Sequence, residues 1–153
     1  MASITKRVLI NAPIHQVYDY VTTPNHWPIL FYPWSIKTEP YLQKPLSPEY
    51  PSIDKQPSLL ERKNNTTWTP EINGAPHYLL AYGESPFLFG IRGYVRYDLA
   101  SKDQQTYFTR TLFYAFDHDF IDFIFGHFIH PYFSYISYRY VNKAKQILDF
   151  HHV

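Results

Sequence analysis

The stretch VLINAPIHQVYDYVTTPNHWPIL, residues 8–30, limits the possible folds more than any other part of the sequence. Its β-branched start predicts a strand, and Pro13 then suits the first turn of a helix, because its fixed φ and missing N–H cost nothing there. Pro24 ends this helix and can begin a second one with Thr23 as its N-cap. Pro28 follows so closely that the second helix must be short. Short helices are marginal alone, so both must pack on a larger element. The first helix has one apolar face, formed by Ile14, Val17, Tyr18 and Val21.

The middle of the chain predicts strands around a proline-rich loop. Residues 40–57 carry five prolines and predict an extended surface loop. We expect short strands on either side of it, over 35–41 and 58–65. Farther on, Asn73-Gly74 is a dipeptide favoured in two-residue hairpin turns, because both central residues there adopt positive φ. An antiparallel meander should follow from the strands predicted over 66–72, 76–83, 87–100 and 105–116.

From residue 117 the hydrophobic pattern changes to a helical period. Pro131 divides this region and is expected to start a helix of about five turns. Its apolar stripe consists of Phe133, Ile136, Tyr140, Ala144, Ile147 and Leu148. The apolar run around Pro131 is too short, and too interrupted by polar residues, to span a bilayer.

A second aromatic stripe in this region has three interpretations: it lines a tunnel mouth, docks on a membrane or caps the open end of the sheet. Docking on anionic lipid would require a basic flank, whereas residues 117–122 are acidic. We therefore expect these residues to cap the sheet: Phe120, Phe123, Ile124, Phe128 and Phe133.

The composition limits the partners. A net charge of +1 gives no general attraction to nucleic acid or to anionic membranes. The absence of cysteine excludes disulfides and thiolate chemistry and fits a reducing compartment. The N-terminus lacks the apolar core of a signal peptide, so a cytoplasmic location is expected. Phe, Tyr and Trp make up 20% of the residues, which a ring-built core explains more simply than a cavity lined by rings.

The order of elements indicates a concave sheet with a long helix laid across it, and a cavity between the two. The segments VLINAPIHQVYDYVTTPNHWPIL and FGHFIHPYFSYISYRYVNKAKQILD resemble the start and the closing helix of the START-like (SRPBCC) superfamily, which includes polyketide cyclase/dehydrase-like proteins. The resemblance implies an α+β helix-grip fold, in which a curved antiparallel sheet is wrapped around a long C-terminal helix and two short helices follow the first strand. It also implies a single domain over residues 1–153. The loop 40–57 departs from the family, and the family has no universal catalytic signature that could be carried over.

Strand alternation and the helix stripes predict which residues face this cavity. Along 87–100 the apolar residues alternate with arginines, and Gly93 should leave room for a ligand or for the helix. The candidate ligand-binding residues are Trp27, Phe31, Tyr82, Phe89, Ile91, Tyr97, Arg110, Phe128, Tyr132 and Ile136.

The side of the sheet on which Arg110 lies depends on the turn within residues 101–104. A turn of two or four residues would place Arg110 inward among the aromatic residues, and a turn of three or five would place it outward. The cost of burying a charge favours the outward alternative. If it points inward, Arg110 is predicted to bind a carboxylate, phenolate or enolate of the ligand.

Two functions of different classes fit these features. The first is the binding or transport of a small hydrophobic ligand, lipid-like or aromatic, in the internal cavity. The second is a polyketide cyclase or dehydrase that uses acid–base chemistry in the same cavity, with Glu71, Glu84, Asp117 or a histidine as candidate groups. An ionisable group deep in the cavity, paired with another polar group, would favour the enzyme. A partner-binding protein with a filled core is a third possibility.

The histidines do not predict a metal site, because Pro131 interrupts the spacing at which a third ligand would follow His127 and His130. We expect no metal, no cofactor, no nucleic-acid partner and no stable membrane insertion. The sequence does not predict the oligomeric state.

Overall fold

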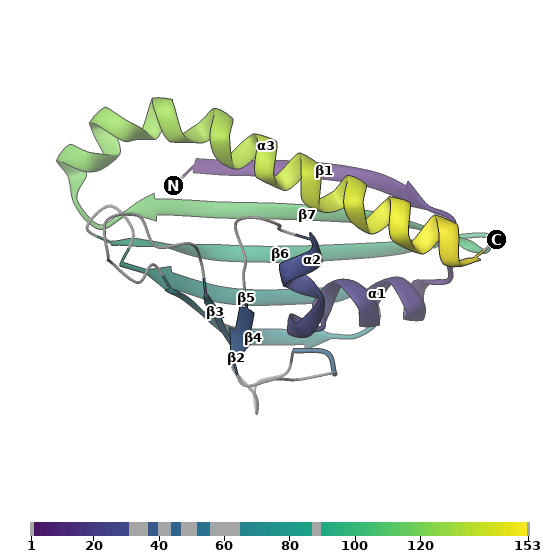
Figure 1. Cartoon of the computed structure of the whole chain (residues 1–153). Coiled ribbons are helices and arrows are strands. Elements are labelled where there is room, and N and C mark those ends of the chain that lie inside the picture. The colour runs from purple at the N-terminus through teal and green to yellow at the C-terminus, as the bar shows by residue number, and fades with distance from the viewer. Residues whose placement is uncertain are drawn as a thin grey trace.

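The computed structural model describes residues 2–30, 37–39, 44–46, 52–55, 65–86 and 90–152. Its strands form one antiparallel sheet, and the described helices lie across one face of it (Figure 1). The elements are β1 (Ala2–Ile10), α1 (Ile14–Thr22), η1 (Pro24–His26), α2 (Trp27–Leu30), β2 (Lys37–Glu39), β3 (Ser52–Lys55), β4 (Asn65–Gly74), β5 (Tyr78–Ser85), β6 (Ile91–Lys102), β7 (Gln105–Phe116) and α3 (Asp119–His152).

The strand order across the sheet is β1-β7-β6-β5-β4-β3-β2, so the first strand pairs with the last one. The first and the last strand of the chain therefore lie side by side. α3 follows β7 and runs back across the inner face beside β1 and β7 (Figure 1). The order confirms the predicted fold class, an α+β helix grip with two short helices after the first strand.

The opening segment folds as its prolines predict. Pro13 is the N-cap of α1, and its carbonyl accepts a hydrogen bond of 3.1 Å from the Val17 N–H. Pro24 begins η1, and Thr23 occupies the N-cap position without a side-chain cap bond. The Thr23 hydroxyl instead donates to the Asp19 carbonyl at 2.5 Å, so it stabilises the end of α1.

The prediction that residues 40–57 are only a surface loop is wrong in two places. Residues Ser52–Lys55 form β3, which pairs with β2 and β4. Leu46 is buried, and its N–H donates to the Thr22 carbonyl at 2.9 Å. A short strand can form here because residues 52–55 contain no proline. β2 lies within the strand predicted over 35–41, whereas the strand predicted over 58–65 lies outside the described residues except for Asn65.

The hairpin of β4 and β5 does not turn at Asn73-Gly74. Gly74 pairs with Tyr78, so the turn consists of residues 75–77, and the Ala75–Pro76 bond in it is cis. The Asn73 side-chain oxygen accepts hydrogen bonds from the Ala75 N–H at 3.2 Å and from the Tyr18 hydroxyl at 2.7 Å. Asn73 therefore lies within β4 next to the turn, and its side chain ties the strand to α1.

The long terminal helix begins earlier than predicted. α3 starts at Asp119 and contains Pro131 in its interior, so the expectation that Pro131 starts the helix is wrong. An internal proline removes one helix hydrogen bond and crowds the preceding turn. The helix nevertheless continues, because His130 and Phe133 on either side of Pro131 both contact Tyr114 of β7. Figure 1 shows that α3 bends over the first part of its length. None of the helices among the described residues is long and apolar enough to cross a membrane.

The main core lies between the second half of α3, helices α1 and α2, and the middle of the sheet. Tyr140, Ala144 and Leu148 of α3 are at most 3% exposed, so this half of the helix packs directly on the sheet. A smaller cluster lies beneath the first half of α3 and is built around Ile4, Tyr114 and Phe116.

Candidate functional site

The turn between β6 and β7 decides which residues face α3. Lys102 pairs with Gln105, which leaves a two-residue turn in which Asp103 has a positive φ of 57°. This register places Tyr97 directly opposite Arg110. Residues directly opposite each other in a ladder project from the same face of the sheet. Arg110 therefore points inward with Tyr97, and the favoured outward alternative is wrong.

Arg110 is buried under α3 and is 4% exposed. Its Nη1 donates a hydrogen bond of 2.8 Å to the Ser137 hydroxyl on α3. Its guanidinium carbon lies 4.9 Å from the centre of the Tyr140 ring. A hydrogen bond and a cation–π contact both offset the cost of removing the charge from water. On the neighbouring strand, Lys6 pairs directly with Arg110, so a second cation projects from the same face of the sheet.

A chain of hydroxyl groups lies beside this arginine. The Tyr140 hydroxyl donates to the Val21 carbonyl at 2.8 Å, and the Tyr97 and Tyr140 oxygens lie 2.9 Å apart. Because the single proton of Tyr140 is used by Val21, Tyr97 must be the donor to Tyr140. Burial, followed by the neighbouring Tyr97, raises the pKa of Tyr140 well above its usual range. The Tyr140 hydroxyl therefore stays protonated at neutral pH and cannot serve as a base.

A second polar contact joins β7 to the first half of α3. The Tyr114 oxygen lies 2.8 Å from Nδ1 of His130, and the Phe133 ring meets the Tyr114 ring edge-on at 4.9 Å between centroids. Burial and then the Asp122 carboxylate raise the pKa of Tyr114. This contact holds the first half of α3 on the sheet, at a position C-terminal to Arg110 on β7.

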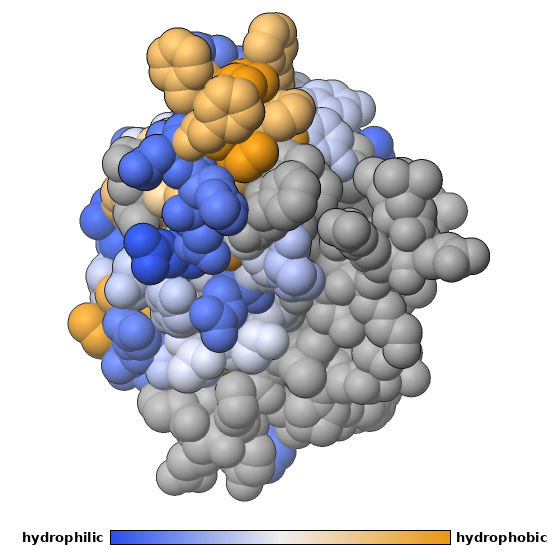
Figure 2. Space-filling model, turned by 90° about the vertical axis from the view of Figure 1, so that its left-hand side faces the viewer, coloured by the Kyte–Doolittle hydropathy of each residue, from blue (hydrophilic) through white to orange (hydrophobic). Residues whose placement is uncertain are grey.

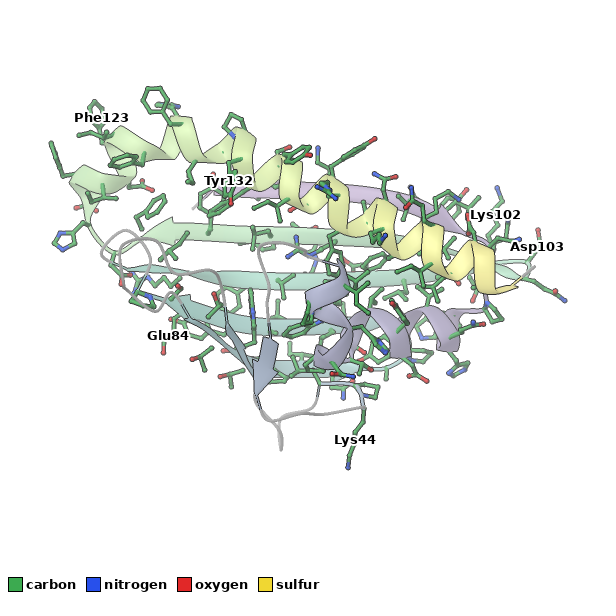
Figure 3. All side chains as sticks on the ribbon, viewed as in Figure 1. Lys44, Glu84, Lys102, Asp103, Phe123 and Tyr132 are labelled. Carbon is green, nitrogen blue, oxygen red and sulfur yellow. The ribbon has the colours of Figure 1, made fainter. Side chains whose placement is uncertain are left out.

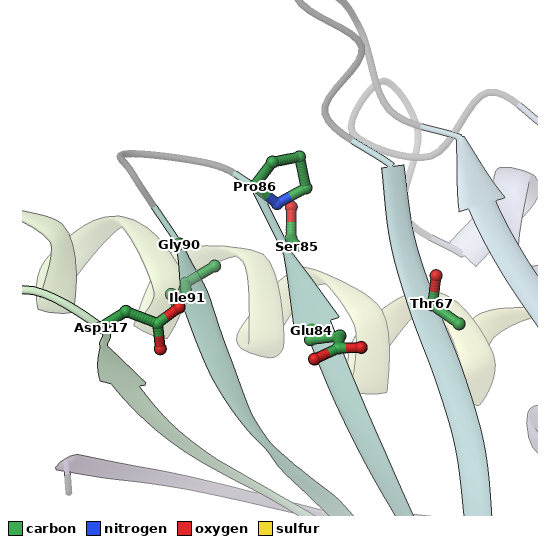
Figure 4. A pocket seen from close by; sticks show the side chains of 7 residues that line it. All are labelled: Thr67, Glu84, Ser85, Pro86, Gly90, Ile91 and Asp117. Carbon is green, nitrogen blue, oxygen red and sulfur yellow. The ribbon is translucent and has the colours of Figure 1, made fainter.

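A pocket of about 590 Å³ opens at the ends of β4 to β7 (Figure 4). Two of the carboxylates considered for acid–base chemistry, Glu84 and Asp117, line it, and an ion pair of 3.5 Å joins Asp117 to Arg92. Gly90 shapes its rim with a φ of 115°, a conformation that favours glycine. Glu71, the third candidate, is exposed on β4. The full lining is Thr67, Glu84, Ser85, Pro86, Gly90, Ile91 and Asp117.

A second groove, of about 640 Å³, runs between α2 and the second half of α3. Its two walls differ in polarity. Pro28, Ile29 and Leu30 of α2 form an apolar wall, and Arg139 and Lys143 of α3 place positive charge on the opposite wall. Both hollows have volumes in the range of small-molecule sites. Among the residues that the structure describes, no three His, Asp or Glu side chains come together as a metal site would require.

The structure brings part of the predicted site together. Trp27, Tyr97 and Arg110 are buried on the inner face. Ile91 and Ile136 are half-buried, and Tyr132 is 40% exposed, on the side of α3 that faces the sheet (Figure 3). Phe31 and Phe89 lie outside the described residues.

Two predicted ligand contacts are not inside. Tyr82 lies on the outer face, where its ring meets that of Tyr94 and its hydroxyl donates to Glu84 at 3.4 Å. Residues 78–82 are all apolar, so their sequence does not show which side faces inward. Phe128 is 77% exposed, because Ile121, Ile129 and Phe133 form the side of the helix that packs on the sheet. Phe120 and Phe123 are also exposed, so the prediction that they cap the sheet is wrong for them.

Gly93 has a different role from the predicted one. A Cβ at this position would collide with the backbone oxygen of Phe113 on β7, so the glycine permits close approach of the two strands. Gly83 lies directly opposite Gly93 on β5, and the ring of Trp68 covers it. Neither glycine opens free space on the inner face, because the Trp68 ring fills it at Gly83 and the Phe113 backbone fills it at Gly93.

Sequence reasoning missed Ser137, Lys6 and the contact between Tyr114 and His130. Ser137 could have been found, because it is a small polar residue one turn before Tyr140 and Val141 on the buried stripe of α3. The partners of Lys6 and Tyr114 come from distant parts of the chain, and no local pattern shows them.

Solved structures share this architecture at low sequence identity. A conserved protein from Geobacillus kaustophilus is 10% identical with a TM-score of 0.75, and the match covers 96% of this chain and 95% of the other. DynU16, from the dynemicin biosynthetic locus, has 10% identity and a TM-score of 0.65 over 96% of this chain and 47% of its own. The Aha1 protein of Colwellia psychrerythraea has 14% identity and a TM-score of 0.62 over 97% of both chains. Neither a family model nor a curated protein matches the sequence. The likeness shows a helix-grip fold.

Proposed function

We propose that this is a START-like (SRPBCC) protein that binds or carries a small hydrophobic molecule beneath α3. In this proposal Arg110 orients the ligand by binding an acidic oxygen of it, from a carboxylate, a phenol or an enol. The observation that carries the proposal is the position of Arg110: a permanent cation, 4% exposed, set among aromatic rings on the inner face of the sheet. A buried cation in apolar surroundings attracts an anionic group more strongly than one in water does.

In this proposal the ligand lies beneath the first half of α3. The second half is packed onto the sheet, whereas Ile91, Phe133 and Ile136 near the first half are half-buried. The pocket of about 590 Å³ opens at the same end of the strands. Affinity would come from the burial of apolar ligand surface, and orientation from Arg110.

Two features favour binding over the cyclase or dehydrase alternative. The buried ionisable group is an arginine, which does not exchange its proton in proteins. Its aromatic neighbour Tyr140 has a pKa raised well above the usual range by burial, so it is not a base either. The fold likeness to DynU16, a protein of a biosynthetic locus, agrees with a small-molecule ligand.

The test is native mass spectrometry of the protein purified from its own host. We expect the wild type to carry a hydrophobic molecule with a carboxyl, phenol or enol group, and Arg110→Met to carry much less of it. Arg96→Met is the matched control, because Arg96 lies on the outer face and bonds to Asp98 at 2.9 Å. A protein that carries no small molecule and also fails to bind added hydrophobic anions would overturn the proposal.

A further inference from the structure

Large aromatic side chains project into solvent from the first half of α3. Phe120, Phe123 and Phe128 are 70%, 78% and 77% exposed. Figure 3 shows Phe123 pointing away from the sheet at the far end of the helix, and Figure 2 shows hydrophobic residues gathered at this extremity of the molecule. Exposed apolar groups of this size, gathered in one place, mark a contact surface. We call this surface the aromatic patch; it comprises Phe120, Phe123, Phe128, Tyr135 and Tyr138.

Charged groups lie at the two ends of the patch: Asp122 stands between Phe120 and Phe123, and the Arg139 guanidinium carbon lies 6.0 Å from the centre of the Tyr135 ring. Residues 123–138 contain no Asp, Glu, Lys or Arg. The charges nearest its start are acidic, at Asp117, Asp119 and Asp122. Anionic membranes and acidic partners attract clusters of Lys and Arg, which this segment lacks. The complementary surface is therefore a neutral one.

The first part of α3 is convex outward (Figure 1), so its rings can enter a soft interface but would meet a rigid surface only near one point. α3 bends over its first part and forms the outermost edge of the molecule there (Figure 1). The phenylalanines lie in this outer part, whereas Tyr135 and Tyr138 follow toward the packed half of the helix. In membrane-bound helices apolar rings enter the acyl region, and tyrosines remain at the level of the headgroups. The order of Phe and Tyr along α3 follows this gradient.

We propose that the aromatic patch docks the protein on the surface of a neutral, zwitterionic lipid bilayer. The contact is peripheral: the rings enter the interface, and no segment crosses it. A second copy of the chain is a poorer occupant, because two outward-bent helices meet only near one point, and a stable dimer buries about 800 Å² on each partner. The proposal does not depend on a ligand beneath α3.

The test is cosedimentation with phosphatidylcholine vesicles. We expect the wild type to bind them, and each of Phe123→Ser and Phe128→Ser to weaken binding by about tenfold or more, since each removes one ring from the interface. Both side chains are exposed, so the fold should survive, which circular dichroism checks. Ile72→Ser is the matched control: Ile72 is 52% exposed on β4, away from the patch, and its loss should leave binding unchanged.

A second readout locates the contact. In Phe123→Trp, vesicles with brominated acyl chains should quench the additional tryptophan emission. The proposal is overturned if neutral vesicles do not bind, if binding requires added phosphatidylserine, or if the serine variants bind as well as the wild type. It is also overturned if sedimentation velocity shows a dimer that the same two substitutions dissociate, because the patch is then a contact between copies.

Discussion

Arg110 of β7 and Ser137 of α3 are joined by a buried hydrogen bond of 2.8 Å that ties the sheet to the helix across it. The bond places the side-chain oxygen of Ser137 against a permanent cation. Tyr140, one turn farther along α3, covers the same guanidinium with its ring. The helix therefore positions the charge, and the charge in turn fixes the orientation of the helix on the sheet.

Replacing Arg110 separates its role in binding from its role in stability. We expect Arg110→Met to weaken binding of anilinonaphthalene sulfonate, an aromatic anion, by about tenfold or more, since one charged hydrogen-bonding partner is lost. The uncharged analogue N-phenylnaphthylamine should bind to both proteins equally. Fluorescence titration with the two probes measures the difference.

Stability should change little in the same variant, by about 1 kcal/mol or less, because a hydrophobic side chain of similar length replaces a charge that is costly to bury. Urea unfolding checks this. If both probes lose affinity to the same extent, Arg110 shapes the cavity but does not recognise an anionic group.

Removing the acceptor on the helix should cost more stability than removing a neighbouring hydroxyl. We expect Ser137→Ala to lower the free energy of unfolding by about 1–3 kcal/mol, since it leaves a buried charged donor without this partner. Ser134→Ala, one turn earlier on the same helix, is the control. Both changes gain the same helix propensity, so their difference in urea unfolding isolates the bond to Arg110. Equal effects would show that water or another group replaces Ser137.

The fold could be predicted because its signals are local. Pro13 and Pro24 mark helix starts whatever surrounds them, and the helices do begin there. The prediction that Pro131 starts a helix is wrong for a tertiary reason. Contacts of His130 and Phe133 with Tyr114 keep α3 intact across a residue that would end an isolated helix. The hairpin turn lies two residues later than predicted, because the Asn73 side chain bonds to the Ala75 N–H and to Tyr18. Tyr18 is distant in the sequence, so no local pattern shows this bond.

The site was harder to predict because its composition depends on register. A change of one residue in the turn before β7 would have moved Arg110 to the outer face, and the cost of burial argued for that side. The sequence does not show that Ser137 and Tyr140 of α3 contact Arg110 and offset the cost of burying its charge. The prediction that Tyr82 faces the cavity is wrong for a related reason. A continuous apolar run has no alternation of period 2 that would show which side faces inward.

The paired glycines of the sheet should be intolerant to a methyl group. In Gly83→Ala the added Cβ would lie 2.5–2.9 Å from three ring atoms of Trp68, so we expect a loss of about 1–3 kcal/mol in the free energy of unfolding. Gly93→Ala should be worse, because the obstacle is the backbone oxygen of Phe113, which cannot rotate away.

Gly126 provides the matched control for these changes. It lies inside α3, and among the described residues an added Cβ would have one neighbour within 4 Å, an Asp122 oxygen at 3.9 Å. Gly126→Ala should therefore stabilise the protein by up to about 1 kcal/mol, through helix propensity. Urea unfolding of the three variants gives the comparison. If alanine is tolerated at 83 and 93, the Trp68 ring and the Phe113 backbone lie farther from these two positions than the structure places them.

Stability should fall at alkaline pH through Tyr18. Burial, and then the Asp19 carboxylate, raise the pKa of Tyr18 from 10.0 to about 12, and its hydroxyl donates to Asn73 at 2.7 Å. Between about pH 10 and pH 12 the unfolded chain has lost a proton that the folded protein keeps. The unfolded state then binds fewer protons, so the free energy of unfolding decreases as the pH rises. This contribution is complete below about pH 10 and is lost above about pH 12.

The variant Tyr18→Phe tests this linkage, because it cannot titrate. Its free energy of unfolding, measured in urea from pH 8 to pH 12, should fall less steeply than that of the wild type, by about one proton in the slope above pH 10. Below about pH 9 the two curves should run parallel, since neither form of the chain titrates there at residue 18, and this range is the internal control. Tyr140, whose pKa burial also raises, remains in both proteins and steepens both curves alike. Parallel curves up to pH 12 would show that the Tyr18 hydroxyl ionises as readily in the folded protein as in the unfolded chain, and that its bond to Asn73 does not hold the proton.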